Sequence, residues 1–263
     1  MGLEALCSLV IAATPYAWGV DGGVTIEQRF APPEGFTRVE VESGTFGAWL
    51  RGLPLKPDGS PVFLHDGSLK RPQTVHAAVI DIDIGTKDLQ QCADGVMRLR
   101  AEWLYGAGKA KEVSFNDTGK GAPISFKRWA AGERPKPKGN ALIWSATAKA
   151  DDSRASFRQY LDTVFVWAGT SSLERQLKAR ALTELAPGDV VIKGGFPGHA
   201  VIVLDVAKKG DATRVMLAQS YMPAQNLHVL KQPDGDVWFP APTSEAPYVT
   251  PEWTFPPNAL RTW

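Results

Sequence analysis

The sequence predicts an α+β fold in which a helix from the first half of the chain packs against an antiparallel sheet formed by its last third. Three observations predict it. An amphipathic helical pattern covers residues 87–105, two more helical segments follow at 156–169 and 171–182, and short strands separated by turns come after Pro187. Helices followed by a meander of strands are typical of α+β proteins.

Composition supports one substantial core and limits the partners. The 263 residues are 44% hydrophobic and include nine Trp and eleven Phe, which is enough apolar material for a single domain over residues 22–263. The net charge is +1, so the chain lacks the long-range attraction that nucleic acid binding uses. We therefore expect small molecules, peptides or glycans as partners, and no nucleic acid.

Residues 1–21 form an apolar segment ahead of this domain. Their longest apolar run, residues 5–19, is too short to span a bilayer, so we expect no stable membrane span. Its length suits the hydrophobic part of a signal peptide, although no Lys or Arg precedes it and Glu4 has the opposite charge. We expect export to the periplasm or the extracellular space, with a cytoplasmic location as the alternative.

The first third of the chain predicts short strands, loops and one regular strand. Residues 22–75 are rich in Gly and Pro, which is typical of short strands and turns. Residues 75–85 then alternate isoleucine with Asp81 and Asp83, a pattern that predicts a strand with one apolar face. We interpret the two aspartates as a solvated strand face, with metal binding as the alternative.

The helix predicted over residues 87–105 carries a cysteine near its start. Asp88 can cap it, with Gln91 at the capping-box position, so that Cys92 ends the first turn. An apolar stripe with spacings of three and four follows: Leu89, Cys92, Val96, Leu99 and Trp103. This stripe places the cysteine on the inward face of the helix.

The polar face of the helix predicted over residues 87–105 and the segments that follow it complete the helical part of the chain. Arg98 and Glu102 stand four residues apart and are interpreted as a solvent-exposed ion pair. A hairpin is predicted between 111 and 150, and the next helix stops at Gly169 before Ser171 caps a new one. The strands expected after Pro187 cover residues 189–195, 199–208, 214–221 and 226–232.

A cysteine nucleophile needs a base, a group that orients the base, and donors for an oxyanion. A helix N-terminus stabilises a thiolate, which suits Cys92. His199 opens an apolar strand directly after a Gly-rich turn and is the candidate base, while Gln219, at the end of the next strand, can orient it. The sequence order is therefore cysteine, histidine, amide.

Four further polar residues are candidates for oxyanion or substrate binding: Gln90, Gln91, Ser220 and Gln225. The Cys92 backbone amide would complete the oxyanion site. No zinc-type spacing exists among the cysteines and histidines, and the chemistry requires no cofactor or metal. The alternative is structural, because a lone cysteine on an apolar helix face is commonly a core residue and a histidine beside a strand commonly a hydrogen-bonding group.

Two stretches resemble known cysteine peptidases. Residues 198–206 followed by 215–221 resemble the His strand and the Asn-Ser strand of papain-like proteases, and residues 186–192 are similar to the turn before the His strand of NlpC-type cell-wall peptidases. The resemblance implies a papain-like or NlpC-like fold with Cys92 as nucleophile, His199 as base and Gln219 as orienting amide. The sequence departs from the papain pattern at three points. Gln90 and Gln91 lie closer to Cys92 than the upstream Gln of that pattern does, no Trp follows Cys92, and Gln219 stands where the pattern has Asn.

A closer resemblance is to an uncharacterised bacterial family, domain of unknown function 4846. It covers the chain from about residue 40 onward and lies in residues 88–94, 98–105, 188–200 and 217–225. This family brings no activity with it.

These observations predict a cysteine hydrolase or transferase that acts on amide bonds. Bacterial cell-wall peptides as substrates are implied by the NlpC-like resemblance alone. The alternative is a non-catalytic peptide- or glycan-binding module that retains the architecture. A sugar hydrolase finds little support, because Asp81 and Asp83 lie on one face of a strand.

Overall fold

The computed structural model describes residues 16, 18 and 23–263. The apolar segment predicted over residues 1–21 therefore lies outside the described residues, apart from Tyr16 and Trp18. The Tyr16 hydroxyl donates to the carbonyl of Trp49, and the indole nitrogen of Trp18 donates to the carbonyl of Asp81. Both rings thus pack on the folded body.

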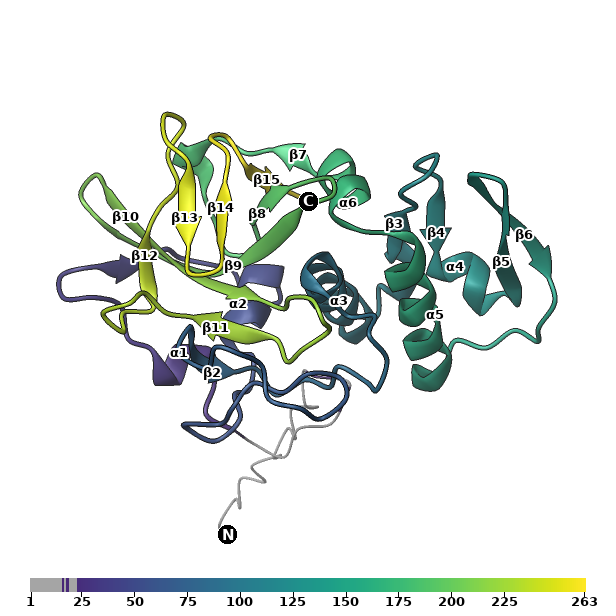
Figure 1. Ribbon diagram of the computed structural model, residues 1–263, viewed down its shortest axis with the longest axis horizontal. Helices are drawn as coiled ribbons and strands as arrows, with labels where there is room; N and C mark the ends of the chain where they lie inside the picture. The colour runs from purple at the N-terminus through teal and green to yellow at the C-terminus, as the bar shows by residue number, and fades with distance from the viewer. Residues whose placement is uncertain (1–15, 17, 19–22) are drawn as a thin grey trace, which may run out of the picture.

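Helices lie mainly in the first two thirds of the chain (Figure 1). They are α1 (Ile26–Arg29), α2 (Phe46–Arg51), α3 (Cys92–Gly106), α4 (Phe126–Ala130), α5 (Arg154–Trp167) and α6 (Thr170–Gln176), with 3₁₀ turns η1 (Ala110–Glu112) and η2 (Leu182–Glu184). None of the helices in the described ranges is long and apolar enough to cross a membrane.

Strands form one large sheet and three separate hairpins. The sheet contains β1 (Thr37–Arg38), β2 (His76–Val79), β7 (Lys178–Ala179), β8 (Val190–Lys193), β9 (His199–Lys209), β10 (Ala212–Gln219), β11 (His228–Leu230), β12 (Trp238–Pro240) and β15 (Leu260–Thr262). The hairpins are β3 (Ser114–Asn116) with β4 (Pro123–Ser125), β5 (Glu133–Lys138) with β6 (Ala141–Ala146), and β13 (Tyr248–Thr250) with β14 (Trp253–Phe255).

The sheet is antiparallel and is built around the β9–β10 hairpin. Its order is β2-β11-β10-β9-β8-β15-β7, with β1 beside the second half of β9 and β12 beside the first half of β10. The predicted α+β class with a mostly antiparallel sheet is confirmed. The prediction that the sheet comes from the C-terminal part alone is incomplete, because β1 and β2 from the first third pair with its strands.

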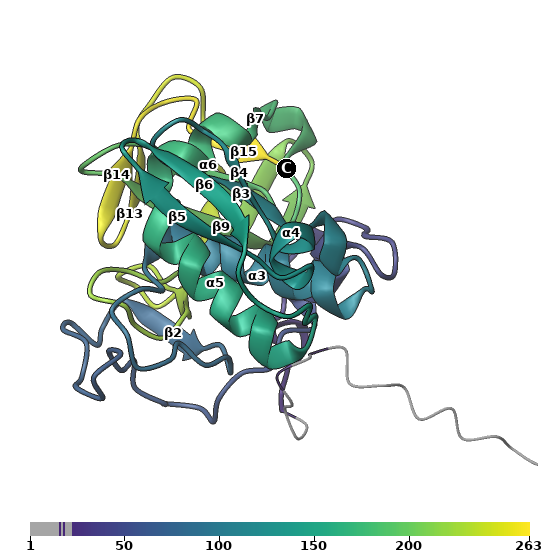
Figure 2. The same cartoon turned by 90° about the vertical axis from the view of Figure 1, so that its right-hand side faces the viewer.

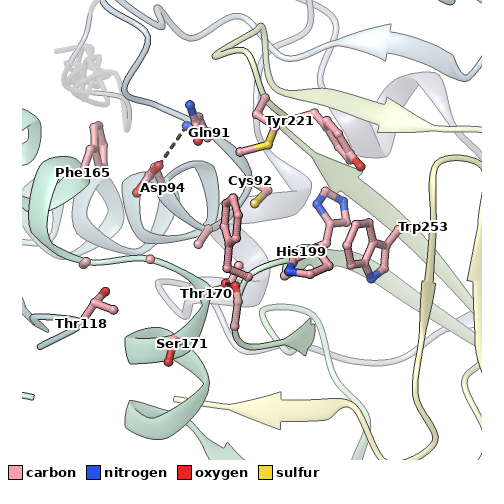
Figure 3. Close-up of a pocket in the computed structure, with 18 residues that line it drawn as sticks. Gln91, Cys92, Asp94, Thr118, Phe165, Thr170, Ser171, His199, Tyr221 and Trp253 are labelled. Carbon is pink, nitrogen blue, oxygen red and sulfur yellow. Dashed lines mark hydrogen bonds between the residues drawn. The ribbon is translucent and has the colours of Figure 1, made fainter.

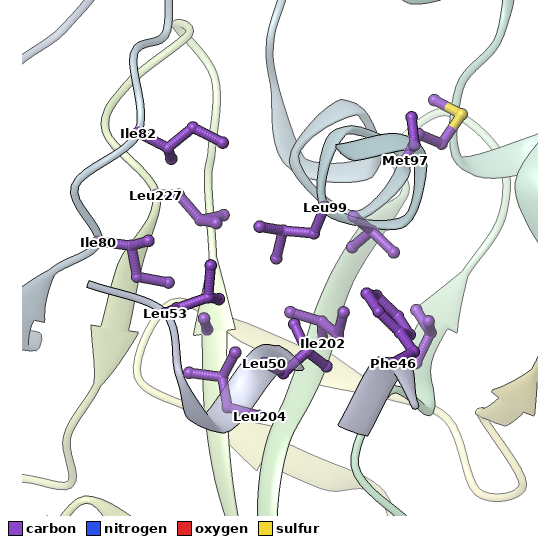
Figure 4. Packing of buried hydrophobic residues seen from close by; sticks show 14 of the residues in the cluster. Phe46, Leu50, Leu53, Ile80, Ile82, Met97, Leu99, Ile202, Leu204 and Leu227 are labelled. Carbon is purple, nitrogen blue, oxygen red and sulfur yellow. The ribbon is translucent and has the colours of Figure 1, made fainter. Parts of the chain in front are cut away.

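Strand β9 is buried on both faces. Ala200, Ile202 and Leu204 point into the larger core with α2 and α3 (Figure 4). The alternate residues Val201 and Val203 point into a second core beneath the β13–β14 hairpin. A strand covered on both faces needs apolar residues at nearly every position, which explains its continuous hydrophobic sequence.

Helix α3 lies between the sheet and the group formed by α5 and the β3–β6 hairpins (Figures 1 and 2). Val96 and Leu99 of the predicted apolar stripe are buried in the core that β9 shares, whereas Cys92 and Trp103 are half-buried. The helix begins at Cys92 and not at Asp88, because Asp88 accepts hydrogen bonds from the Ala224 N–H and the Gln91 side chain. Cys92 is therefore the first residue of the helix.

The predicted exposure of the Arg98–Glu102 pair is wrong. Each residue is 1% exposed, because α5 covers that face of α3. Arg98 donates to Glu102, to Asp83 and to the Gln90 side chain, while Glu102 also accepts from Arg154. Opposite charges and several hydrogen bonds offset the desolvation of this buried network.

Replacing Ile202 tests the contact between β9 and α3. Ile202 is 0% exposed, so Ile202→Ala should lower the free energy of unfolding by about 2–5 kcal/mol through lost burial and a cavity. Val249→Ala, at a residue that is 65% exposed, should change it by less than about 0.5 kcal/mol. Urea denaturation measures both values, and equal values for the two variants would contradict the described packing.

Candidate active site

A pocket of about 590 Å³ opens at the N-terminus of α3 (Figure 3). Three parts of the chain form it: the first residues of α3, the α5–α6 connection at residues 168–171, and the β8–β9 turn at residues 195–198. The wall is completed by Thr118, Phe165, His199, Tyr221, Met222 and Trp253. The pocket thus lies where the sheet, α3 and the α5 group meet.

Cys92 lines this pocket and is half-buried. Figure 3 shows its sulfur on the side of the α3 start where the His199 ring lies. Burial raises the pKa of the Cys92 thiol to about 11, and the charge of Asp94 acts in the same direction. Hydrogen bonds from the backbone amides of Ala93 and Ala200 lower that pKa. The resting sulfur is therefore a neutral thiol at pH 7.

His199 is the first residue of β9 and is 1% exposed. Its ring packs against the rings of Tyr221 and Trp253, with centroid separations of 4.6 and 5.3 Å. Burial lowers the pKa of His199 to about 4, although the hydrogen bond to Gln219 opposes this shift. The imidazole is therefore neutral at pH 7 and able to accept a proton.

Gln219 fixes which nitrogen of His199 carries the proton. Its Nε2 donates to Glu252 Oε2 at 2.6 Å, so its Oε1 is left to accept from His199 Nε2, which lies 2.8 Å away. We assign the proton to His199 Nε2 from this network. Nδ1 then carries the lone pair that can accept a proton. The His199 ring lies between Cys92 and Trp253 in Figure 3.

Glu252 and Lys70 extend the chain of contacts behind the histidine. Lys70 Nζ lies 2.6 Å from Glu252 Oε1, and Lys70 is 3% exposed. Glu252 lies in the turn between β13 and β14, far along the chain from both Lys70 and His199. The sequence analysis missed these two residues, and no spacing or motif around either of them indicates the contact.

The other predicted polar residues divide between the pocket and the structure beneath it. Gln91 lines the pocket, with its side-chain nitrogen donating to Asp88. Gln90 is 1% exposed and holds Arg98. The Ser220 hydroxyl lies 3.1 Å from the Gln90 carbonyl and 2.8 Å from the Gln225 carbonyl. Gln90, Ser220 and Gln225 therefore fasten the end of β10 to the segment that precedes α3.

Backbone amides provide donors at the mouth of the pocket. The first four N–H groups of an α-helix have no partner within the helix. Cys92 and Ala93 are the first two residues of α3, and both line the pocket. Their amides can therefore donate to an oxygen bound next to the sulfur.

The turn before His199 is tightly packed on α6. A Cβ atom at Gly198 would lie 2.4 Å from Thr170 Oγ1 and 2.5 Å from the carbonyl oxygen of Gly195, so a side chain here requires backbone movement. Thr170 itself donates to that Gly195 carbonyl. Phe196, which follows, is 97% exposed at the rim of the pocket.

Residues 16, 18 and 23–263 contain no group of three or more His, Cys, Asp or Glu side chains that could hold a metal ion. Asp83, which the sequence left open as a metal ligand, pairs with Arg98.

The helix, the histidine strand and the strand that carries Gln219 all lie within one family domain. The chain belongs to the family described as domain of unknown function 4846, whose model matches residues 26–262. The predicted membership is confirmed, and the match begins nearer the N-terminus than the resemblance did. Neither the curated proteins nor the solved structures contain a match to the chain. The site of this DUF4846 domain must therefore be interpreted from its own geometry.

Acidification tests the buried neutral histidines. The ordinary histidine pKa is 6.5, and burial lowers it to about 4 for His199 and about 3 for His228. The unfolded chain therefore binds protons first as the pH falls below 6.5, and stability falls with it. For His199 the loss should reach about 3 kcal/mol near pH 4.

Urea denaturation between pH 7.5 and 4 measures this loss. His199→Gln should remove the contribution of His199 to this loss, so that the free energy of unfolding falls less on acidification in the variant than in the wild type. An equal loss in the two proteins would mean that His199 titrates normally in the folded state.

Proposed function

We propose that this protein is a cysteine-dependent hydrolase or transferase of amide bonds, with Cys92 as nucleophile and His199 as base. One observation carries the proposal: a thiol at a helix N-terminus lines the same pocket as an imidazole whose Nε2 proton is held by Gln219. A nucleophile, a base and a third group that orients the base are the requirements of this chemistry.

The reaction would begin with proton transfer inside the pocket. His199 Nδ1 accepts the thiol proton as the Cys92 sulfur attacks the carbonyl carbon and forms a C–S bond. The carbonyl oxygen becomes an oxyanion, which the backbone amides of Cys92 and Ala93 at the helix N-terminus stabilise. The imidazolium then gives its proton to the leaving nitrogen, the C–N bond breaks, and a thioester remains on Cys92.

Release of the acyl group would use the same histidine. His199 takes a proton from an incoming water, which attacks the thioester carbon and restores the thiol. An incoming amine in place of water gives transfer. The geometry supports both outcomes equally, because the same pocket admits either nucleophile.

The two pKa shifts support proton transfer during attack over a preformed ion pair. The pKa of Cys92 is raised to about 11 and that of His199 lowered to about 4, so the neutral pair is the resting form. The negative charge of Glu252, joined to the ring through Gln219, supports the imidazolium once it forms. The positive charge of Lys70 in turn offsets the desolvation cost of burying the Glu252 carboxylate.

A papain-like or NlpC-like arrangement is the finer form of this proposal. It is supported by the order of cysteine, histidine and amide, and by a cysteine that opens a helix packed on an antiparallel sheet. Cell-wall peptides as substrates rest on the sequence resemblance, and an exported location rests on the apolar run at residues 5–19; both remain predictions.

Trapping of an acyl-enzyme tests the proposed function. Incubation with p-nitrophenyl esters, acid quench and peptide mass spectrometry should show a hydroxylamine-labile acyl group on Cys92. Cys92→Ala should carry none, and His199→Gln should acylate about 100-fold or more slowly because the general base is lost.

The matched control is His76→Gln, at a histidine that contacts His228 outside the pocket and should acylate at the wild-type rate. Absence of any adduct on Cys92, or equal acylation by the wild type and His199→Gln, would favour the non-catalytic binding module.

Glu252 should act as a positioning residue. Glu252→Gln removes the acceptor charge that orients Gln219, so kcat should fall about 10- to 100-fold while KM stays within about twofold. Glu245→Gln, at an exposed residue, is the control and should leave both constants unchanged. Thermal unfolding identifies any variant whose fold is lost, and an unchanged kcat in folded Glu252→Gln would rule out the positioning role.

A further inference from the structure

The pocket contains a second polar feature, which the proposed chemistry does not use. Asp94 lines it from the first turn of α3 and is 6% exposed. Its Oδ2 accepts the N–H of Gln91 at 3.0 Å, whereas its Oδ1 is buried without a hydrogen-bond partner among the described residues. Buried carboxyl oxygens are nearly always hydrogen-bonded, so this atom needs a partner that the described chain does not supply.

Asp94 lies away from the reacting sulfur. Figure 3 shows its carboxyl group on the opposite side of the helix mouth from Cys92, on the side where Phe165 and Thr118 lie. All four residues line the same pocket. One ligand can therefore extend from the sulfur to the carboxyl group, with the Phe165 ring beside it.

The charges of the pocket favour a cation at this position. Asp94 is the one side chain charged in its ordinary state at pH 7 among the described residues that line the pocket, and no Lys or Arg of the described chain pairs with it. Lys193 and Arg175 donate to the carbonyls of the pocket residues Pro197 and Thr118 but do not themselves line the pocket. A ligand anion would meet no cationic side chain in the pocket lining.

We propose that Asp94 Oδ1 binds a primary ammonium group of the substrate, so that the enzyme acts on amides whose acyl part carries a free amine. This inference rests on the proposed function and names its substrate class. Burial holds the pKa of Asp94 well above its usual range. An ammonium group would supply both the missing donor and the opposite charge that stabilises the carboxylate.

Matched esters test the inference. The probes are p-nitrophenyl esters of ω-amino acids with two to six methylene groups, each paired with its N-acetylated form. For at least one chain length, the wild type should acylate on Cys92 at least 10-fold faster with the free amine. The ratio of the two rates should fall to near one in Asp94→Asn.

The asparagine variant separates the possible roles of the side chain. The amide oxygen of the asparagine can still accept the Gln91 N–H, as the Oδ2 atom of Asp94 does. The amide NH₂ group, which is a donor, then stands where Asp94 has its unpartnered oxygen. A carboxyl group that acts as a neutral donor would keep its function in Asp94→Asn, and that outcome overturns the inference. Glu34→Gln removes an exposed negative charge and should keep the wild-type ratio.

Binding to Cys92→Ala separates the two proposals. Hexylamine should bind this protein at least 10-fold more tightly than hexanol, and the added Asp94→Asn change should abolish the difference. Selective amine binding without acylation by any ester of the wild type would contradict the proposed function alone. Acylation without any preference for the free amine would contradict the inference alone.

Discussion

The packing of α3 on β9 is the constraint on which the rest of the structure depends. The apolar stripe of the helix is buried against Ala200, Ile202 and Leu204, and this contact places the start of the helix beside the start of the strand. Cys92 is the first residue of α3 and His199 the first residue of β9. Cys92 and His199 thus line the same pocket because two regular elements, fixed by the core, both begin there.

The same burial determines the chemistry of the site. Desolvation raises the pKa of Cys92 and lowers that of His199, which keeps both groups neutral at rest. A neutral pair must be well oriented, because no charge attraction draws the groups together. Gln219 and Glu252 provide that orientation from the sheet and the β13–β14 turn. Asp94 remains as a buried carboxyl group whose second oxygen has no hydrogen-bond partner among the residues that the structure describes.

The sequence indicated the local parts of the site and not its long-range contacts. Helical spacing and a Gly-rich turn before an apolar strand predicted the positions of the thiol and of His199, and strand order predicted that Gln219 could reach the ring. Glu252 and Lys70 carry no local signal, because their ion pair joins segments 182 residues apart in the sequence. Periodicity also failed for Arg98, since one helix considered alone does not reveal that a second helix covers its polar face.

The pH dependence of Cys92 alkylation tests most directly whether His199 is the base. Iodoacetamide labelling, followed at the Cys92 peptide by mass spectrometry, should be nearly independent of pH between the values of about 4 and about 11 at which the two groups titrate. This plateau requires the neutral imidazole to take the thiol proton, so it should vanish in His199→Gln and leave only a rise toward pH 11. The same single rise in the wild type would contradict the account.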